Sequence, residues 1–322
     1  MMEHLALIWL FIIAFTFLLY VILDGFTLGV GMLFPWLNPE ERDIAVSSIL
    51  PTWDGNQTWL VFSLAALYGM FPIAFAFLLP KIYLPAILLA LMLLFRGICF
   101  EFRLKSTAGI KNWDRLFAFS SFIITFIHGY LAGQLIIGYH LAHYESGLLF
   151  KCVTGFVLVL GYMLLGATRL IIKTEGDLLL KARKASIIIM RLVLLGMVFV
   201  GLLTYFYHRL PNWDSHKFTL LAAFALFVII GFIILPRAIK SARHFYAYWI
   251  SVGIFVCTYS SMLVYIFPYI IPYELTYEQA KASDMTLWFT LIIAMFMIPL
   301  LLLYTGYAYY IFRGKTKEKL HY

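Results

Sequence analysis

Residues 5–23, LALIWLFIIAFTFLLYVIL, form an almost unbroken apolar run near the start of the chain. A helix of about 20 apolar residues is long enough to cross the hydrocarbon core of a bilayer. The stretch DGFTLGVG follows at once over residues 24–31. No basic region precedes the run and no small-residue cleavage site interrupts it, so we interpret it as a retained helix and not as a signal peptide. The sequence therefore predicts an integral membrane protein.

The composition of the whole chain supports this prediction. Hydrophobic residues make up 63% of the 322 residues, and charged residues make up only 12%. A soluble domain of this length has about a quarter charged residues and needs them to cover its surface. The net charge is +8, but the basic residues stand in short clusters between apolar runs, which is typical of membrane orientation and not of a nucleic-acid interface.

Nine apolar segments are long enough to be membrane helices. Backbone groups in hydrocarbon must be paired within the segment, and the runs are too long for barrel strands, so the predicted fold is all-α. The second segment is the least hydrophobic of the nine. With four helices on either side of the fifth, two four-helix bundles are possible, in one membrane domain covering residues 1–322. The predicted spans are 5–35, 50–72, 79–102, 116–138, 148–172, 186–207, 218–237, 245–268 and 286–311.

Lysine and arginine residues predict the orientation of these nine spans. If the termini lie on opposite sides of the membrane, 17 of the 24 Lys and Arg residues fall on the side of the C-terminus. Basic residues are enriched in cytoplasmic loops, so we expect a cytoplasmic C-terminus and a periplasmic N-terminus. The three cysteines, Cys99, Cys152 and Cys257, lie in or beside apolar runs without a C-x-x-C pair, and we expect them to be packing residues.

Asp24 is the first ionisable residue that the pattern places at membrane depth. Burying a charge there is costly, so such a residue is a functional hypothesis by default. The glycines after it, spaced four apart, allow a neighbouring backbone to approach closely, which indicates that Asp24 faces protein. Either Asp24 handles protons or binds a polar ligand group, or it is a buried carboxylate that only joins helices.

A second polar cluster, WDGNQTW, covers residues 53–59 at the cytoplasmic end of the second span. Asp54, Gln57 and Thr58 are spaced i, i+3, i+4 and share a helix face, where they could hold water and pass protons inward. Alternatively, Asp54 satisfies free N–H groups at a helix N-terminus, and tryptophans such as Trp53 are interfacial anchors.

Arg96 and Glu101 lie near the end of the third span, in FRGICFEFR over residues 95–103. Arg96 is the deeper of the two, and we expect it to pair with an inward carboxylate such as Asp54, or with Glu101. The alternative is that its side chain extends to the cytoplasmic interface.

Histidine is the residue with which a haem or metal site would begin. His128 is the one histidine predicted at mid-membrane, and hydrogen-bonded packing is favoured there over ligation. His140 and His143, with Glu145 nearby, are a weak metal signal on the outer side. No H-E-x-x-H, P-loop or G-x-G-x-x-G motif is present. We therefore predict no self-sufficient catalytic residues and no metal site in this chain.

Five motifs in order resemble subunit II of cytochrome bd-type quinol oxidases, including the cyanide-insensitive branch. They are LDGFTLGVGML at 23–33, WDGNQTWL at 53–60, FRG through EFR at 95–103, FPYIIP with LT at 267–276, and YT with FRGK at 304–315. Together they extend over essentially the whole chain.

The resemblance implies a partner, the haem-bearing subunit I, in which haem b and haem d would lie. It implies a terminal oxidase of the bacterial inner membrane that oxidises quinol and reduces dioxygen to water, with protons drawn from the cytoplasm. Within this chain it implies proton entry at Asp54 and, less directly, at Asp24. A small accessory subunit and a structural quinone are further expectations, and the sequence does not locate the quinone.

Two other functions remain open at this point. A proton-coupled transporter would use Asp24 and Asp54 to couple protons to substrate, but inverted repeats typical of transporters are not evident. A purely structural oxidase subunit would share every feature except proton transfer at Asp54.

Overall fold

The computed structural model describes residues 4–106, 109–139, 144–207 and 215–316. Almost all of these residues are helical, which confirms the all-α fold class. The elements are α1 Leu5–Leu33, η2 Phe34–Trp36, α2 Pro39–Ile49, α3 Trp53–Met70, α4 Pro72–Lys105, α5 Ile110–Ile137, α6 Tyr144–Lys173, α7 Gly176–Tyr207, α8 Ser215–Lys240, α9 Phe245–Ile266, β1 Tyr269–Ile271, β2 Leu275–Thr276, α10 Tyr277–Ala280 and α11 Asp284–Ile311.

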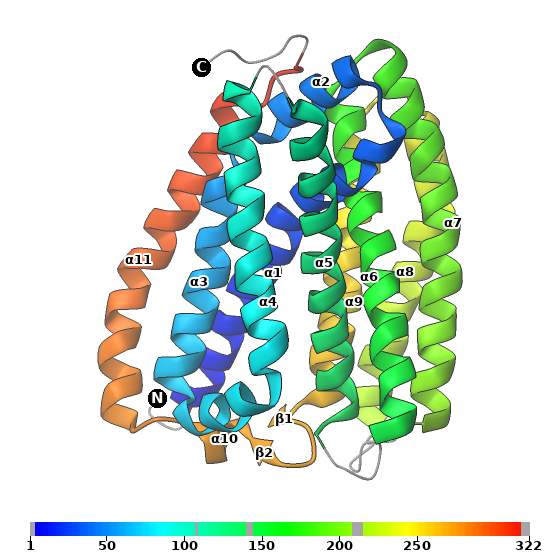
Figure 1. Ribbon diagram of the computed structural model, residues 1–322. Coiled ribbons are helices and arrows are strands. Elements are labelled where there is room, and N and C mark those ends of the chain that lie inside the picture. Colours follow the sequence, from blue (N-terminus) through cyan, green and yellow to red (C-terminus); the bar gives the residue numbers. More distant parts are fainter. Residues whose placement is uncertain (1–3, 107–108, 140–143, 208–214, 317–322) are drawn as a thin grey trace.

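Eight of the described helices are long and apolar enough to cross a membrane. These eight match the predicted spans other than the second. The second predicted span is α3, which falls outside the eight because its first turns carry Asp54, Asn56 and Gln57. In Figure 1, α3 runs alongside the long helices, between α11 and α4.

The long helices divide into two groups of four. One group consists of α1, α3, α4 and α5, and the other of α6, α7, α8 and α9. The groups join where α6 packs against α1 and α5. Helix α11 packs against α1 and α3 and lies at the edge of the molecule (Figure 1). The predicted pair of four-helix bundles is confirmed, but the helix outside the bundles is the ninth span, α11, and not the fifth, α6, which belongs to the second bundle.

Glycines create the close crossing of α1 and α6. A Cβ atom on Gly29 would lie 1.8 Å from the backbone oxygen of Tyr162, and one on Gly166 would lie 2.5 Å from the backbone of Gly29. Neither position can take a larger residue without separating the helices. The glycines after Asp24 therefore do allow a neighbouring backbone to approach, as their spacing predicts.

The two ends of the molecule differ in charge. Helix α2, the turns that join α4 to α5 and α6 to α7, and the end of α11 lie at one end, and the β1–β2 hairpin with α10 lies at the other (Figure 1). Ion pairs gather at the first end, where Asp114 is bridged by Arg42 and Arg103. The further pairs at this end are Arg103–Asp43, Lys181–Glu41 and Lys315–Glu175.

A polar site inside the membrane helices

Asp24 forms a fully buried ion pair with Arg96. Both side chains are 0% exposed, and the Nη1 atom of Arg96 lies 2.9 Å from each carboxylate oxygen of Asp24. Thr27 donates a further hydrogen bond to the carboxylate at 2.6 Å. The pair joins α1 to α4 through two residues that are 72 positions apart in sequence. A charge at this depth requires such a partner.

Arg96 pairs with an inward carboxylate, as predicted, but this carboxylate is Asp24 and not Asp54, the residue given as the example, nor Glu101. Glu101 is exposed on α4 and forms an i, i+4 pair with Lys105 at 3.2 Å. Arg96 also does not extend to the interface. The error arose because contacts between helices, and not spacing along one helix, determine which carboxylate an arginine reaches.

Tyr20 and His128 lie beside the buried Asp24–Arg96 pair. Tyr20 stands one helical turn before Asp24, close enough for the charge of the Asp24 carboxylate to act on its hydroxyl group. The hydroxyl of Tyr20 lies 3.3 Å from Nε2 of His128 on α5. Arg96, Asp24, Tyr20 and His128 therefore form one buried polar group. Sequence reasoning did not include Tyr20, although its i, i+4 spacing from Asp24 was a usable signal.

Asp54 lies in a different environment from Asp24. It stands in the first turn of α3, is exposed, and has no ion pair or hydrogen bond with any residue in the described part of the chain. Thr58, one turn later, is exposed on the same face. Gln57 is partly covered, and its amide nitrogen is buried without a hydrogen-bond partner among the described residues. The predicted three-residue stripe is thus divided between an outer and an inner face.

Other side chains of the WDGNQTW cluster fix α3 in place. Asn56 is buried, donates to the backbone oxygen of Leu23 at 2.8 Å, and accepts a hydrogen bond from Tyr309 of α11 at 2.9 Å. Trp53 packs against Phe100 of α4 with ring centroids 4.7 Å apart. Trp53 is therefore a packing residue between α3 and α4.

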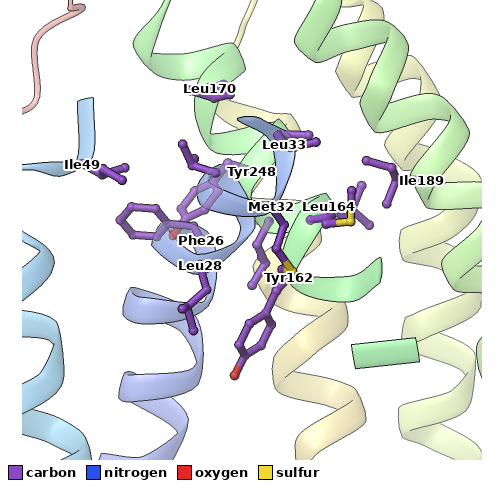
Figure 2. Close-up of a cluster of buried hydrophobic side chains, with 14 of the residues drawn as sticks. Phe26, Leu28, Met32, Leu33, Ile49, Tyr162, Leu164, Leu170, Ile189 and Tyr248 are labelled. Carbon is purple, nitrogen blue, oxygen red and sulfur yellow. The ribbon is translucent and has the colours of Figure 1, made fainter. Parts of the chain in front are cut away.

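Tyr309 belongs to an aromatic group around Arg169. The guanidinium carbon of Arg169 lies 4.9 Å from the ring centroid of Phe26, 5.2 Å from that of Tyr248 and 5.6 Å from that of Tyr309. These rings come from α1, α9 and α11, and Figure 2 shows Phe26 beside Tyr248. Cation–π attraction at this point holds three helices around α6. From the sequence, Arg169 was considered only as one of the basic residues that predict the orientation of the spans.

Titration is perturbed at the basic end of the molecule, outside the membrane helices. Burial lowers the pKa of His244, and the nearby charges of Lys315 and Arg183 lower it further, while Glu175 opposes this effect. Nδ1 of His244 lies 3.2 Å from Arg183. The described residues contain no group of three metal-ligating side chains. The weak signal of His140 and His143 lies outside the described residues, as does the side chain of Glu145.

The sequence is similar to known subunits of cytochrome bd oxidases. The family model for cytochrome bd terminal oxidase subunit II matches residues 5–312. The cytochrome bd ubiquinol oxidase subunit 2 of Bacillus subtilis is 27% identical over 99% of this chain and 98% of its own length. The cytochrome bd-I ubiquinol oxidase subunit 2 of Escherichia coli K12 is 32% identical over 57% of this chain and 53% of its own length.

A solved structure shares the fold. A chain in the structure of the bd oxidase from Geobacillus thermodenitrificans superposes with a TM-score of 0.73, at 17% identity, covering 93% of this chain and 97% of that one. The motifs at Asp24, Asp54 and Arg96 lie within the range that the family model matches. This chain belongs to the cytochrome bd terminal oxidase subunit II family and is a subunit of a membrane oxidoreductase.

Proposed function

We propose that this chain supports a haem-bearing subunit I and admits protons from the cytoplasm at Asp54. The observation that carries the proposal is the position of Asp54, exposed at the start of α3 without a partner among the described residues. On the same face, the exposed residues continue one or two turns apart, through Thr58, Val61 and Tyr68. This outer face of α3 is the surface that we assign to subunit I.

The cost of charge in lipid supports this assignment. An aspartate facing acyl chains near the end of a span costs free energy unless water or protein solvates it. A partner subunit on the outer face of α3 would shield Asp54 from lipid and leave it in contact with water at the end of the membrane. A carboxyl group in this position can take up a proton from one side and release it to the other, as general acid–base transfer requires.

Asp24 differs, because its carboxylate is fully buried and accepts hydrogen bonds from Arg96 and Thr27. We assign Asp24 to the joining of α1 and α4, with Asp54, Thr58 and Gln57 as the entry group for protons. In the purely structural alternative, Asp54 also transfers no protons and the whole chain serves only to support subunit I. A proton role for Asp24 remains a prediction.

The reaction belongs to the complex. The related Bacillus and Escherichia proteins are named as subunits of ubiquinol oxidases. By this relation the complex would oxidise a quinol and reduce dioxygen to water. In this chain Nε2 of His128, midway along α5, faces Tyr20, which supports hydrogen-bonded packing for this histidine. We therefore place haem b and haem d in subunit I, whose haems would carry the electron transfer.

The orientation follows from the charged end. Ion pairs and basic residues gather where α2, the α4–α5 turn and the end of α11 meet. Basic residues near helix ends favour the cytoplasmic side. We propose that this end, with the start of α3, faces the cytoplasm of a bacterial inner membrane. Asp54 would then lie on the side from which protons are drawn.

The test compares Asp54→Asn and Asp54→Glu with the unaltered complex, purified with subunit I. Glu40→Gln is the matched control, because Glu40 is an exposed acidic residue of α2 at the same end. Haem content of the purified complex checks assembly. We expect Asp54→Asn to lower quinol-driven oxygen consumption at least tenfold, and Asp54→Glu to retain most of it. Wild-type rates in Asp54→Asn at every pH, with haem content preserved, would favour the purely structural subunit.

A further inference from the structure

Three buried side chains from three different helices have polar atoms without hydrogen-bond partners among the described residues. They are Nε and Nη2 of Arg96 on α4, the hydroxyl of Tyr162 on α6, and Nδ1 of His128 on α5. Arg96 and Tyr162 are 0% exposed and His128 is 8% exposed. A buried polar atom without a partner costs about 1–3 kcal/mol, so three such groups in one region require partners in the folded protein.

These groups are neighbours. The ring centroids of His128 and Tyr162 are 6.3 Å apart, and the charge of Arg96 acts on the imidazole of His128. The Tyr162 ring lies over Gly25, next to Asp24, where a Cβ atom would be 3.1 Å from it. Figure 2 shows the Tyr162 hydroxyl pointing away from the cluster of buried apolar side chains. The unpaired atoms thus surround one region beside the Asp24–Arg96 pair.

The neighbours of Tyr20 indicate which nitrogen of His128 carries the proton. Tyr20 has a single hydroxyl proton, and the carboxylate of Asp24, one helical turn away, can only accept, so we assign the hydroxyl proton of Tyr20 to Asp24. The oxygen of Tyr20 must then accept from Nε2–H of His128, 3.3 Å away. Nδ1 of His128 is consequently the unprotonated nitrogen, with a lone pair that needs a hydrogen-bond donor.

The two ends of this group are complementary. Arg96 offers only donors, and Nδ1 of His128 offers only an acceptor, while the Tyr162 hydroxyl between them can do both. A water molecule can accept a hydrogen bond from Arg96 and donate one to His128. A group that only donates, or only accepts, could satisfy one of these two side chains but not both. A mainly apolar pocket of about 330 Å³ adjoins the group between α1, α5, α6, α7 and α9, and His128 and Tyr162 are among its lining residues. Water is held where polar partners are present, so we place it at the polar atoms of His128 and Tyr162 and not in the apolar remainder of the pocket.

We infer that an internal water site lies between Arg96, Tyr162 and His128, with its waters oriented by the arginine at one end and the histidine at the other. The waters accept hydrogen bonds from the guanidinium and donate to Nδ1 of His128. Together with Asp24 and Tyr20 they close a ring of hydrogen bonds around the buried ion pair. The waters solvate the charge of Arg96. The carboxylate of Asp24 accepts from only one of the three guanidinium nitrogens, Nη1. The site does not depend on proton entry at Asp54.

Two measurements on the intact oxidase in lipid nanodiscs test this site. The first is an electron cryomicroscopy map at about 2 Å resolution. We expect at least two separate water peaks, one within hydrogen-bond distance of Arg96 and one within hydrogen-bond distance of Nδ1 of His128. The Tyr162→Phe complex should lose at least one peak, while Tyr130→Phe, the same change two residues from His128 on α5, should retain both.

The second measurement is the ¹⁵N spectrum of labelled histidine, in which His128→Gln identifies the signals of His128. We expect the unaltered complex to show protonated Nε2 and unprotonated, hydrogen-bonded Nδ1. Tyr20→Phe removes the acceptor for Nε2–H and should yield a mixture of the two tautomers. A map without density in this region would overturn the inference. So would one elongated density of an amphipathic molecule, or a protonated Nδ1 in the unaltered complex.

Discussion

Asp24 and Asp54 are two aspartates of the same membrane protein in opposite environments. Asp24 is fully buried, with Arg96, Thr27 and Tyr20 around its carboxylate. Asp54 is exposed on the outer face of α3 and has no partner among the described residues. The two carboxylates therefore have different roles in this account. Asp24 stabilises the packing of the helices, and the environment of Asp54 is set by the water, lipid or protein outside this chain.

The largest effect should follow from breaking the buried pair. Arg96→Met leaves the carboxylate of Asp24 buried without its counter-charge, which costs about 3–5 kcal/mol. We expect the loss of assembled complex, measured as haem recovered per unit of membrane protein. The double variant Asp24→Leu with Arg96→Met should recover much of the assembly, because it removes both charges. Equal loss in the double variant would show that the pair does more than stabilise packing.

The next effect concerns activity on the outer face. Thr58→Val removes the hydroxyl beside Asp54 and leaves the volume almost unchanged. As an exposed substitution it should change stability by no more than about 0.5 kcal/mol. If Thr58 holds water for Asp54, oxygen consumption should fall several-fold while haem content is unchanged. Thr219→Val, the same change at an exposed threonine of α8, is the control and should leave the rate unaltered.

A smaller effect is expected at the link between α3 and α11. Tyr309→Phe removes the hydrogen bond to Asn56, which contributes about 0.5–1.5 kcal/mol. The ring, and with it the contact to Arg169, remains. We expect a lower midpoint temperature of the purified complex with a near-normal rate of oxygen consumption. A fall in rate without a fall in midpoint would mean that Tyr309 acts on the proton path.

The smallest effect is the pH dependence at the basic end. The pKa of His244 is lowered by burial and by Lys315 and Arg183, so the folded state favours the neutral imidazole. Its contribution to stability is present above the ordinary histidine pKa of about 6.5 and is lost as the pH falls below that value. His244→Gln should therefore flatten the midpoint temperature between about pH 7 and pH 5. Identical pH profiles of the two proteins would contradict this interpretation.

Much of the fold was predictable because it depends on composition and on local spacing. The apolar runs predicted the helices, and the glycines after Asp24 predicted a close helix crossing, which Gly29 and Gly166 form. Several helices begin before their predicted spans. Helix α4 begins at Pro72 and not near residue 79, because proline is compatible with the first turn of a helix. Helix α7 begins at Gly176 and not near residue 186.

The site was predictable only in part, since its contacts join distant helices. Asp24, Asp54 and Arg96 were recognised individually by their cost in a membrane. The pairing of Arg96 with Asp24 was missed, because 72 residues separate them and only the packing of α3 and α5 between α1 and α4 brings them together. Tyr20, Tyr309 and Arg169 were missed because tyrosines and an arginine near helix ends are common in membrane proteins. For His128, hydrogen-bonded packing was the favoured interpretation, and Tyr20 is its partner.

The most direct test of the contrast between the two aspartates is infrared spectroscopy of the intact oxidase during a change of pH. A carboxyl group that exchanges protons with water produces a C=O signal that appears as the pH falls. The account predicts such a signal in the unaltered complex and in Glu40→Gln, and its loss in Asp54→Asn. If the signals that appear with falling pH are the same in Asp54→Asn as in the unaltered complex, Asp54 does not exchange protons and the central claim is wrong.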